Sequence, residues 1–217
     1  MTELYKLVGD RGWTKPVEDV ELTWTADLHT NTLEKGTHLC ASPVFHAHEH
    51  PLIAVLMNPI QARLNPATMR LFVAEGEIVA RDGQLKCGVF SLEIIEEIPV
   101  PVLTDEQRVM CAIMCAKEVG VASRVWLDWA DNWLKGVDRS SEAAESVINF
   151  LNSAPKNAYL EDARHATWAA HHSYSSLRDL SSQSAAKSIQ MAVQALNSLD
   201  VVALLAQTSR LDDHTQQ

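Results

Sequence analysis

Hydrophobic and polar residues alternate in the first part of the chain, which is the spacing of strands with one buried face. A composition rich in Gly and Asp predicts turns between them, with Arg81-Asp82-Gly83 as a hairpin turn and residues 27–36 as a loop. The strands predicted from this pattern span residues 4–8, 20–24, 37–40, 71–80 and 86–98.

One short helix is expected within this strand-rich part. Pro51 suits the first turn of a helix, where its missing N–H would have no partner anyway. The apolar residues that follow, Leu52 to Leu56, supply one to two turns before Asn58-Pro59. The N-terminal part therefore reads as a small α+β domain.

Beyond residue 103 the apolar spacing changes to three and four residues, as in amphipathic helices. Thr104 and Gln107 form a capping box at the first helix. A stripe of tryptophans follows, which we interpret as core rather than as a ligand-binding face: Trp126, Trp129, Ala130, Trp133 and Leu134. Further stripes over residues 144–151, 163–177 and 189–196, with a short last helix over 201–206, complete a predicted antiparallel helical bundle.

The helix-breaking residues locate the domain boundary. All eight glycines lie at or before Gly136, and seven of the eight prolines lie at or before Pro101. Gly and Pro weaken helices, so the chain divides where they become rare. We expect an α+β domain over residues 1–100, a helical bundle over 103–211, and a disordered tail over 212–217.

Charge and cysteine content restrict the function classes. The formal net charge is −10, and the chain has no run rich in Lys or Arg. Nucleic-acid binding needs a basic surface, so direct binding of DNA or RNA is not expected. Four cysteines lack the spacing of a disulfide framework or a zinc ribbon, and no apolar run is long enough for a membrane span. These features predict a cytoplasmic protein with reduced thiols and no membrane association.

The stretch from His38 to Leu52 concentrates four of the nine histidines. In an extended conformation His46, His48 and His50 would share one face, where three imidazoles could bind zinc or copper, with Cys40 or His38 as a fourth ligand. The alternative is a packed His46 beside two histidines on a solvated turn. We favour that alternative, so no metal and no other cofactor is expected.

The run Phe45-His46-Ala47-x-Glu49-x-Pro51-Leu52, preceded by Leu39-Cys40, resembles the signature of a phage and prophage domain of unknown function. The resemblance covers about residues 4–103 and continues at Gly76-Glu77-Ile78-Val79 and Asp82-Gly83. His48 and His50 depart from that pattern, which leaves His46 and Glu49 as the expected binding residues. Three runs of the helical part are similar, more loosely, to the Ala- and Trp-rich repeats of proposed immunity proteins: Cys111-Ala112-Ile113-Met114-Cys115-Ala116, Trp129-Ala130-Asp131-Asn132-Trp133-Leu134-Lys135-Gly136 and Trp168-Ala169-Ala170.

These resemblances imply an accessory protein of phage type that binds another protein without catalysis, in the host cytoplasm, and that inhibits a host or defence protein. No complete catalytic motif is present in the sequence. The first alternative is an NAD-dependent enzyme similar to ADP-ribosyltransferases, with Tyr5, His46 and Glu96 or Glu97 as candidate catalytic residues. The second is a structural or assembly protein of the virion. The sequence leaves the partner and the oligomeric state open.

Overall fold

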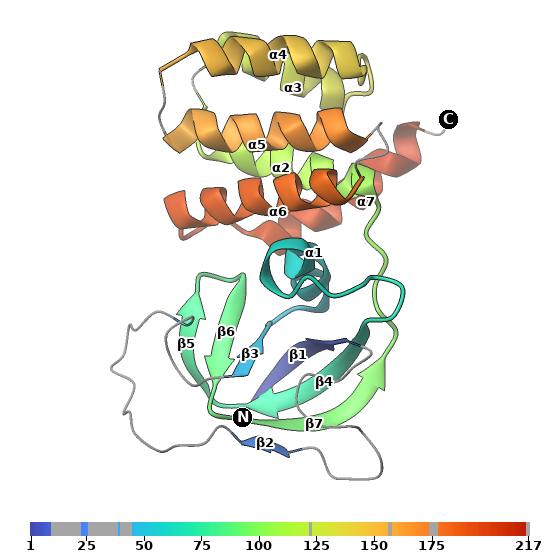
Figure 1. Cartoon of the computed structure of the whole chain (residues 1–217), viewed down its shortest axis with the longest axis vertical. Coiled ribbons are helices and arrows are strands. Elements are labelled where there is room, and N and C mark those ends of the chain that lie inside the picture. Colours follow the sequence, from blue (N-terminus) through green and yellow to red (C-terminus); the bar gives the residue numbers. More distant parts are fainter. Residues whose placement is uncertain are drawn as a thin grey trace. The chain divides into compact units, whose positions relative to one another are not determined.

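The computed structural model describes residues 1–9, 23–25, 39, 45–121, 123–155, 158–173 and 178–215. It is a mixed α/β structure in which strands come first and helices follow (Figure 1). The chain divides into two compact units, Met1–Val102 and Leu103–Gln217. Among the described residues, no helix is both long and apolar enough to cross a membrane.

The N-terminal unit contains two antiparallel sheets in its described part. The four-stranded sheet has the order β1 (Thr2–Val8), β4 (Arg70–Gly76), β7 (Ser91–Ile98) and β2 (Thr23–Thr25). The three-stranded sheet has the order β3 (Phe45–Ala47), β6 (Lys86–Val89) and β5 (Ile78–Asp82). The expected loop over residues 27–36 lies outside the described residues, as does the predicted strand over 37–40, apart from Leu39, which is not in a strand.

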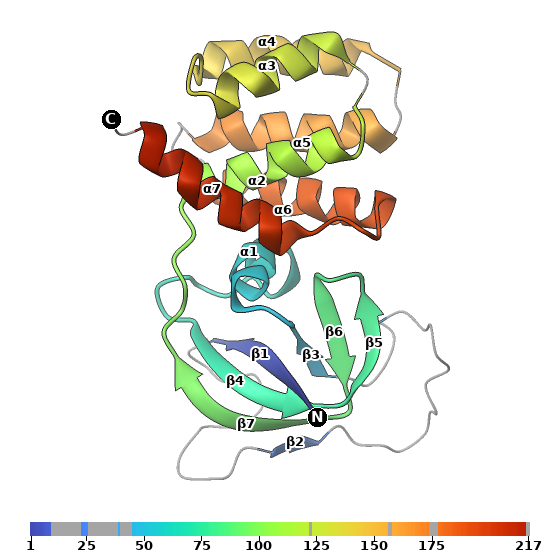
Figure 2. The ribbon, with the colours of Figure 1, turned by 180° about the vertical axis from the view of Figure 1, so that it is seen from behind.

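Residues 71–80 and 86–98 are each predicted to form one long strand, but each range contains two shorter strands. The prediction of two continuous strands was therefore wrong. The hairpin turn after Asp82 is confirmed, but the hairpin bends halfway along, and each arm passes from one sheet to the other (Figures 1 and 2). At the bend, a Cβ on Gly76 would lie 2.9 Å from the Ser91 carbonyl oxygen and 3.2 Å from Val89 Cγ1. Only glycine permits this close approach of the arms.

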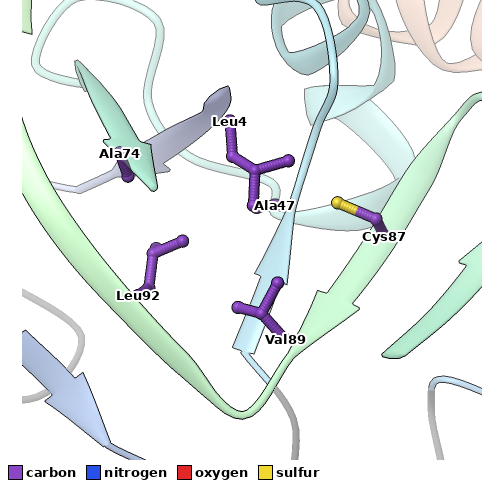
Figure 3. Packing of buried hydrophobic residues seen from close by; sticks show 6 residues of the cluster. All are labelled: Leu4, Ala47, Ala74, Cys87, Val89 and Leu92. Atoms are coloured by element: carbon purple, nitrogen blue, oxygen red, sulfur yellow. The ribbon is translucent and has the colours of Figure 1, made fainter. Parts of the chain in front are cut away.

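A backbone bridge between β1 and the residue that follows β3 also joins the two sheets. Tyr5 N–H donates to His48 O at 2.7 Å, and His48 N–H donates to Tyr5 O at 3.0 Å. The sheets enclose an apolar cluster, shown in Figure 3, to which Phe45, Ile78 and Ile94 add partly buried side chains. Its fully buried members are Leu4, Ala47, Ala74, Cys87, Val89 and Leu92. Burial of each large apolar side chain contributes roughly 1.5–3 kcal/mol.

Helix α1 (Pro51–Gln61) packs on the four-stranded sheet through Ala54, which meets Leu7 and Leu71. Pro51 stands in its first turn, as predicted. The helix does not end before Asn58-Pro59, however. The Asn58 side chain binds both backbone groups of Leu64 at 3.0 Å, and Asn58 O accepts from Ala62 N–H. These bonds hold Asn58 helical, although a following proline disfavours that conformation.

The second unit is helical in its described part. Its helices are α2 (Asp105–Glu118), α3 (Arg124–Leu134), α4 (Ser141–Ser153), α5 (Ala158–Ser173), α6 (Arg178–Ala195) and α7 (Val201–Thr215). Helix α2 contacts α3, α5, α6 and α7, while α5 contacts α2, α4 and α6, so these two helices are central to the unit. The capping box of Thr104 and Gln107 at the start of α2 is confirmed.

Small side chains allow α5 and α6 to approach closely. Buried alanines line both helices: Ala163, Ala166, Ala169 and Ala170 on α5, and Ala185, Ala186 and Ala192 on α6. Buried hydroxyl groups make bonds within and between the helices, such as Ser181 Oγ to Ala169 O at 2.8 Å. Helix α7 continues to Thr215, into the expected disordered tail of residues 212–217. No Gly or Pro interrupts it, and extending a formed helix adds one hydrogen bond per residue.

Candidate functional site

His46 lies in β3 at the centre of the histidine stretch. Its Nε2 donates to the Leu39 carbonyl oxygen at 3.2 Å, and its own carbonyl oxygen accepts from Lys6 Nζ at 2.7 Å. The ring is half-buried, and burial is the main cause that lowers the pKa of His46; Lys86 and Lys6 lower it further, while the bond to Leu39 opposes the shift. His46 is therefore a neutral hydrogen-bonding group at neutral pH.

His48 is a buried structural residue, so the expectation that it lies on a solvated turn was wrong. Its Nδ1 donates to Leu85 O at 2.9 Å, in the turn between β5 and β6, while its backbone pairs with Tyr5 of β1. Burial lowers the pKa of His48 to about 4, with smaller contributions from nearby Lys6, Lys86 and His46. The neutral ring thus ties the hairpin turn to β1.

His50 has a third role, as the N-cap of α1. Its Nδ1 accepts from Leu52 N–H at 3.2 Å. The three imidazoles have separate partners, because His46 bonds to Leu39 O, His48 to Leu85 O and His50 to Leu52 N–H. Among the described residues, no group of three or more His, Cys, Asp or Glu side chains could hold a metal ion.

Glu49, an expected binding residue, is held by an ion pair. The Arg81 guanidinium binds its carboxylate in a two-point contact, with Nε at 2.9 Å and Nη2 at 3.0 Å. This pair links the turn before α1 to β5. Both side chains remain partly exposed, so the contact positions the two segments more than it stabilises the fold.

Lys6 and Cys87 complete the polar neighbourhood of the histidines. Desolvation lowers the pKa of Lys6 to about 8, against an opposing effect of Cys87. Burial is the main cause that raises the pKa of the Cys87 thiol to about 11. At neutral pH the thiol is therefore protonated and unreactive, since the thiolate is the nucleophile.

The candidate catalytic residues Tyr5, Glu96 and Glu97 do not converge on His46. Tyr5 donates its hydroxyl to Glu3 Oε1 at 2.5 Å. Glu97 accepts from Arg70 Nε at 3.0 Å and from its Nη2, which fixes that carboxylate on β4. Glu96 is exposed and stands two strands from Tyr5, because both pair with Val73. That separation is about 10 Å.

The four-stranded sheet does bring together three glutamates that sequence reasoning missed. Glu3 pairs with Glu75, and Glu75 pairs with Glu93, so the carboxylates form one row across β1, β4 and β7. Glu3 and Glu93 are exposed and Glu75 is half-buried. Part of this arrangement follows from the hairpin turn after Asp82. The register that this turn sets between the two arms places Glu75 opposite Glu93. We call this set the glutamate row.

Beside the glutamate row, β7 carries an irregularity. Val73 pairs with Glu96 and Ala74 with Ile94, which leaves Ile95 as the extra residue of a β-bulge. Ile95 is 53% exposed. An exposed apolar side chain between Glu93 and Glu96 gives this part of the sheet an apolar contact point within an acidic surface.

The three tryptophans of α3 lie in the core, as predicted. Trp126 and Trp133 are almost fully buried and Trp129 is 6% exposed, whereas Leu134 is only half-buried. Trp126 Nε1 donates to Thr167 Oγ1 at 3.0 Å. The Arg139 guanidinium lies over the Trp133 ring at 4.6 Å and donates to Trp133 O at 2.8 Å. The first contact joins α3 to α5, and the second joins α3 to the segment between α3 and α4.

Comparison with known proteins gives no relative: no family model matches the sequence, and neither a curated protein nor a solved structure does.

Proposed function

We propose that this protein is a non-catalytic protein-binding module of phage accessory type, and that its N-terminal unit binds a basic surface of another protein through the glutamate row. The row itself is the observation that carries the proposal. Like charges directly opposite one another destabilise a sheet, so folding alone gives no reason for the arrangement of Glu3, Glu75 and Glu93. A cationic partner would turn that repulsion into a favourable contact.

The surroundings of the row support a protein as the partner. A nucleic acid would be repelled by three aligned carboxylates and by a chain of net charge −10. Ile95, exposed in the bulge of β7, supplies an apolar contact of the kind that anchors protein interfaces. The phage resemblance of residues 4–103 points the same way, toward an accessory protein acting on a host or defence protein in the host cytoplasm.

The bonding of the other candidate residues also favours binding over catalysis. Tyr5, Glu49 and Glu97 are held by Glu3, Arg81 and Arg70 respectively, and His46 is bonded to Leu39. We further propose that the helices over residues 105–215 form an antiparallel bundle that acts as a rigid scaffold. The rigidity would come from its buried tryptophans and close alanine contacts.

The test compares two variants of equal charge change. Glu3→Gln/Glu75→Gln/Glu93→Gln removes the glutamate row, and Glu118→Gln/Glu142→Gln/Glu145→Gln removes three exposed carboxylates from the helical unit. Wild-type protein should capture a stoichiometric basic partner from host lysate, with binding that weakens as salt rises. The row variant should lose the partner at least tenfold in affinity, and the helical variant should keep it.

Melting temperature separates loss of binding from loss of fold. Relief of like-charge repulsion should leave the row variant as stable as wild type or slightly more stable. Retention of the same partner at full affinity by a folded row variant would refute the proposal. Stabilisation by NAD in a thermal-shift titration would instead favour the enzymatic alternative, because a ligand that binds the folded state raises its apparent stability.

A further inference from the structure

The interior of the helical unit contains a carboxyl group with no cationic partner among the described residues. Asp162 of α5 is 1% exposed. Its Oδ1 accepts from the Ser188 hydroxyl of α6, and its Oδ2 is buried without a hydrogen-bond partner in the described residues. An ionised carboxylate in such a place would be strongly destabilising.

The hydrogen bonds around Ser188 show why a proton fits here. Its Oγ lies within reach of three acceptors: Asp162 Oδ1, Asp162 O at 3.3 Å and Ala112 O of α2 at 3.5 Å. A hydroxyl group has one hydrogen, so it can serve these acceptors only in turn. A protonated Asp162 adds a second donor: its O–H bonds to Ser188 Oγ, and the Ser188 O–H then bonds to a backbone carbonyl. The neutral acid thus satisfies a junction of α2, α5 and α6 that the carboxylate leaves short of donors.

Among the residues that the structure describes, the neighbouring titratable groups offer no compensating charge. From α2, Cys115 faces Asp162, and its thiol pKa is raised by the bond to Cys111, by burial and by the Asp162 charge itself. Glu118 of α2 also raises the pKa of the Cys115 thiol, and as an acidic residue it supplies no positive charge. Glu142 and Glu145 of α4 are exposed.

The charges nearest in sequence are engaged elsewhere. Glu161 and Arg164 of α5 form an ion pair with each other. Lys187 of α6 bonds to Gln190, and it adds to the effect of burial, which is the main cause that lowers the pKa of His165. Burial accordingly raises the pKa of Asp162 to about 7, against the opposing bond from Ser188.

We propose that Asp162 is a pH-sensitive switch within the helical unit: protonated, it closes the α2–α5–α6 junction through Ser188, and ionised, it loosens that junction. The sign follows from linkage. The folded unit holds a proton that the unfolded chain has lost, so the folded state is favoured at acidic pH and loses stability as pH rises toward and through neutrality.

Wild-type protein tests the proposal directly. In ¹³C-Asp-labelled full-length chain, the Asp162 carboxyl resonance should titrate with a midpoint near neutral pH. Amide exchange at the facing positions of α2, α5 and α6, corrected for intrinsic rates, should accelerate between pH 5.5 and pH 8. An Asp162 midpoint near 4 would overturn the proposal even if no variant folds.

Asp162→Asn provides the second arm, with Asp128→Asn as the matched exposed control. From pH 5.5 to pH 8 the unfolding constant of the wild-type helical unit should rise by on the order of tenfold or more. The rise should disappear in Asp162→Asn and persist in Asp128→Asn, as followed by fluorescence of the buried tryptophans in urea. Parallel pH profiles for wild type and Asp162→Asn would likewise contradict the switch.

Discussion

At the scale of single residues, burial decides what His48 can do. A histidine on a strand edge could act as a base or a ligand, but the His48 ring is enclosed and its Nδ1 is committed to Leu85 O. Its pKa, lowered to about 4, means that folding requires the neutral ring. Because the unfolded chain takes up a proton near pH 6.5, acid favours unfolding of the N-terminal unit.

The expected result is a loss of about 2 kcal/mol in the stability of the N-terminal unit between pH 7 and pH 5. The lowered pKa gives the sign: stability is fully present above the unfolded value and declines as pH falls toward the folded one. His48→Asn keeps a donor near Leu85 O and should flatten this dependence. His50→Asn preserves a favoured helix cap and should change the profile less than His48→Asn, because His50 is only half-buried although burial lowers its pKa too. Urea unfolding at each pH measures both, and an unchanged profile in His48→Asn would show that another group is responsible.

At the scale of elements, the bent hairpin organises the N-terminal unit. Its arms supply β4 and β7 to one sheet and β5 and β6 to the other. Gly76 and Ser91 face one another at the bend, where the arms approach too closely for a side chain. The local contact at this corner therefore determines how the two sheets enclose their shared apolar cluster.

Gly76→Ala should destabilise the N-terminal unit by about 1–3 kcal/mol, the usual range for overpacking. The added methyl would meet a backbone oxygen, which cannot move aside without disturbing the pairing of β4 and β7. Gly9→Ala is the control, since its Cβ would meet only the flexible end of Leu64 at 3.1 Å. Equal thermal shifts for the two variants would mean that the bend tolerates a side chain.

The bend at Gly76 also shows which features of the fold could be predicted from the sequence and which could not. Features set by neighbouring residues were predictable, including the Thr104–Gln107 capping box, the Asp82 turn and the tryptophan stripe of α3. The bend at Gly76 depends on an oxygen 15 positions later, and the continuation of α1 through Pro59 depends on Leu64. The glutamate row needed the pairing of β1 with β4, which no local pattern encodes.

At the scale of the whole molecule, the two units carry buried titratable groups of opposite effect. Acid should weaken the N-terminal unit through His48, and base should weaken the helical unit through Asp162. Peptide-resolved amide exchange at pH 5.5 and pH 8 should therefore show protection moving in opposite directions in Met1–Val102 and Leu103–Gln217. A shift in the same direction for both units would contradict one of the two assignments.

The bent hairpin also determines where this chain can change in length. Extra residues at the Gly83 tip would only enlarge a turn. A single residue inserted at Glu77 or Phe90 would instead slide one sheet's pairing against the other's and turn a strand's inward side chains outward. Natural variation and domain insertion should therefore concentrate at the tip, while the number of residues from each corner to the tip stays constant.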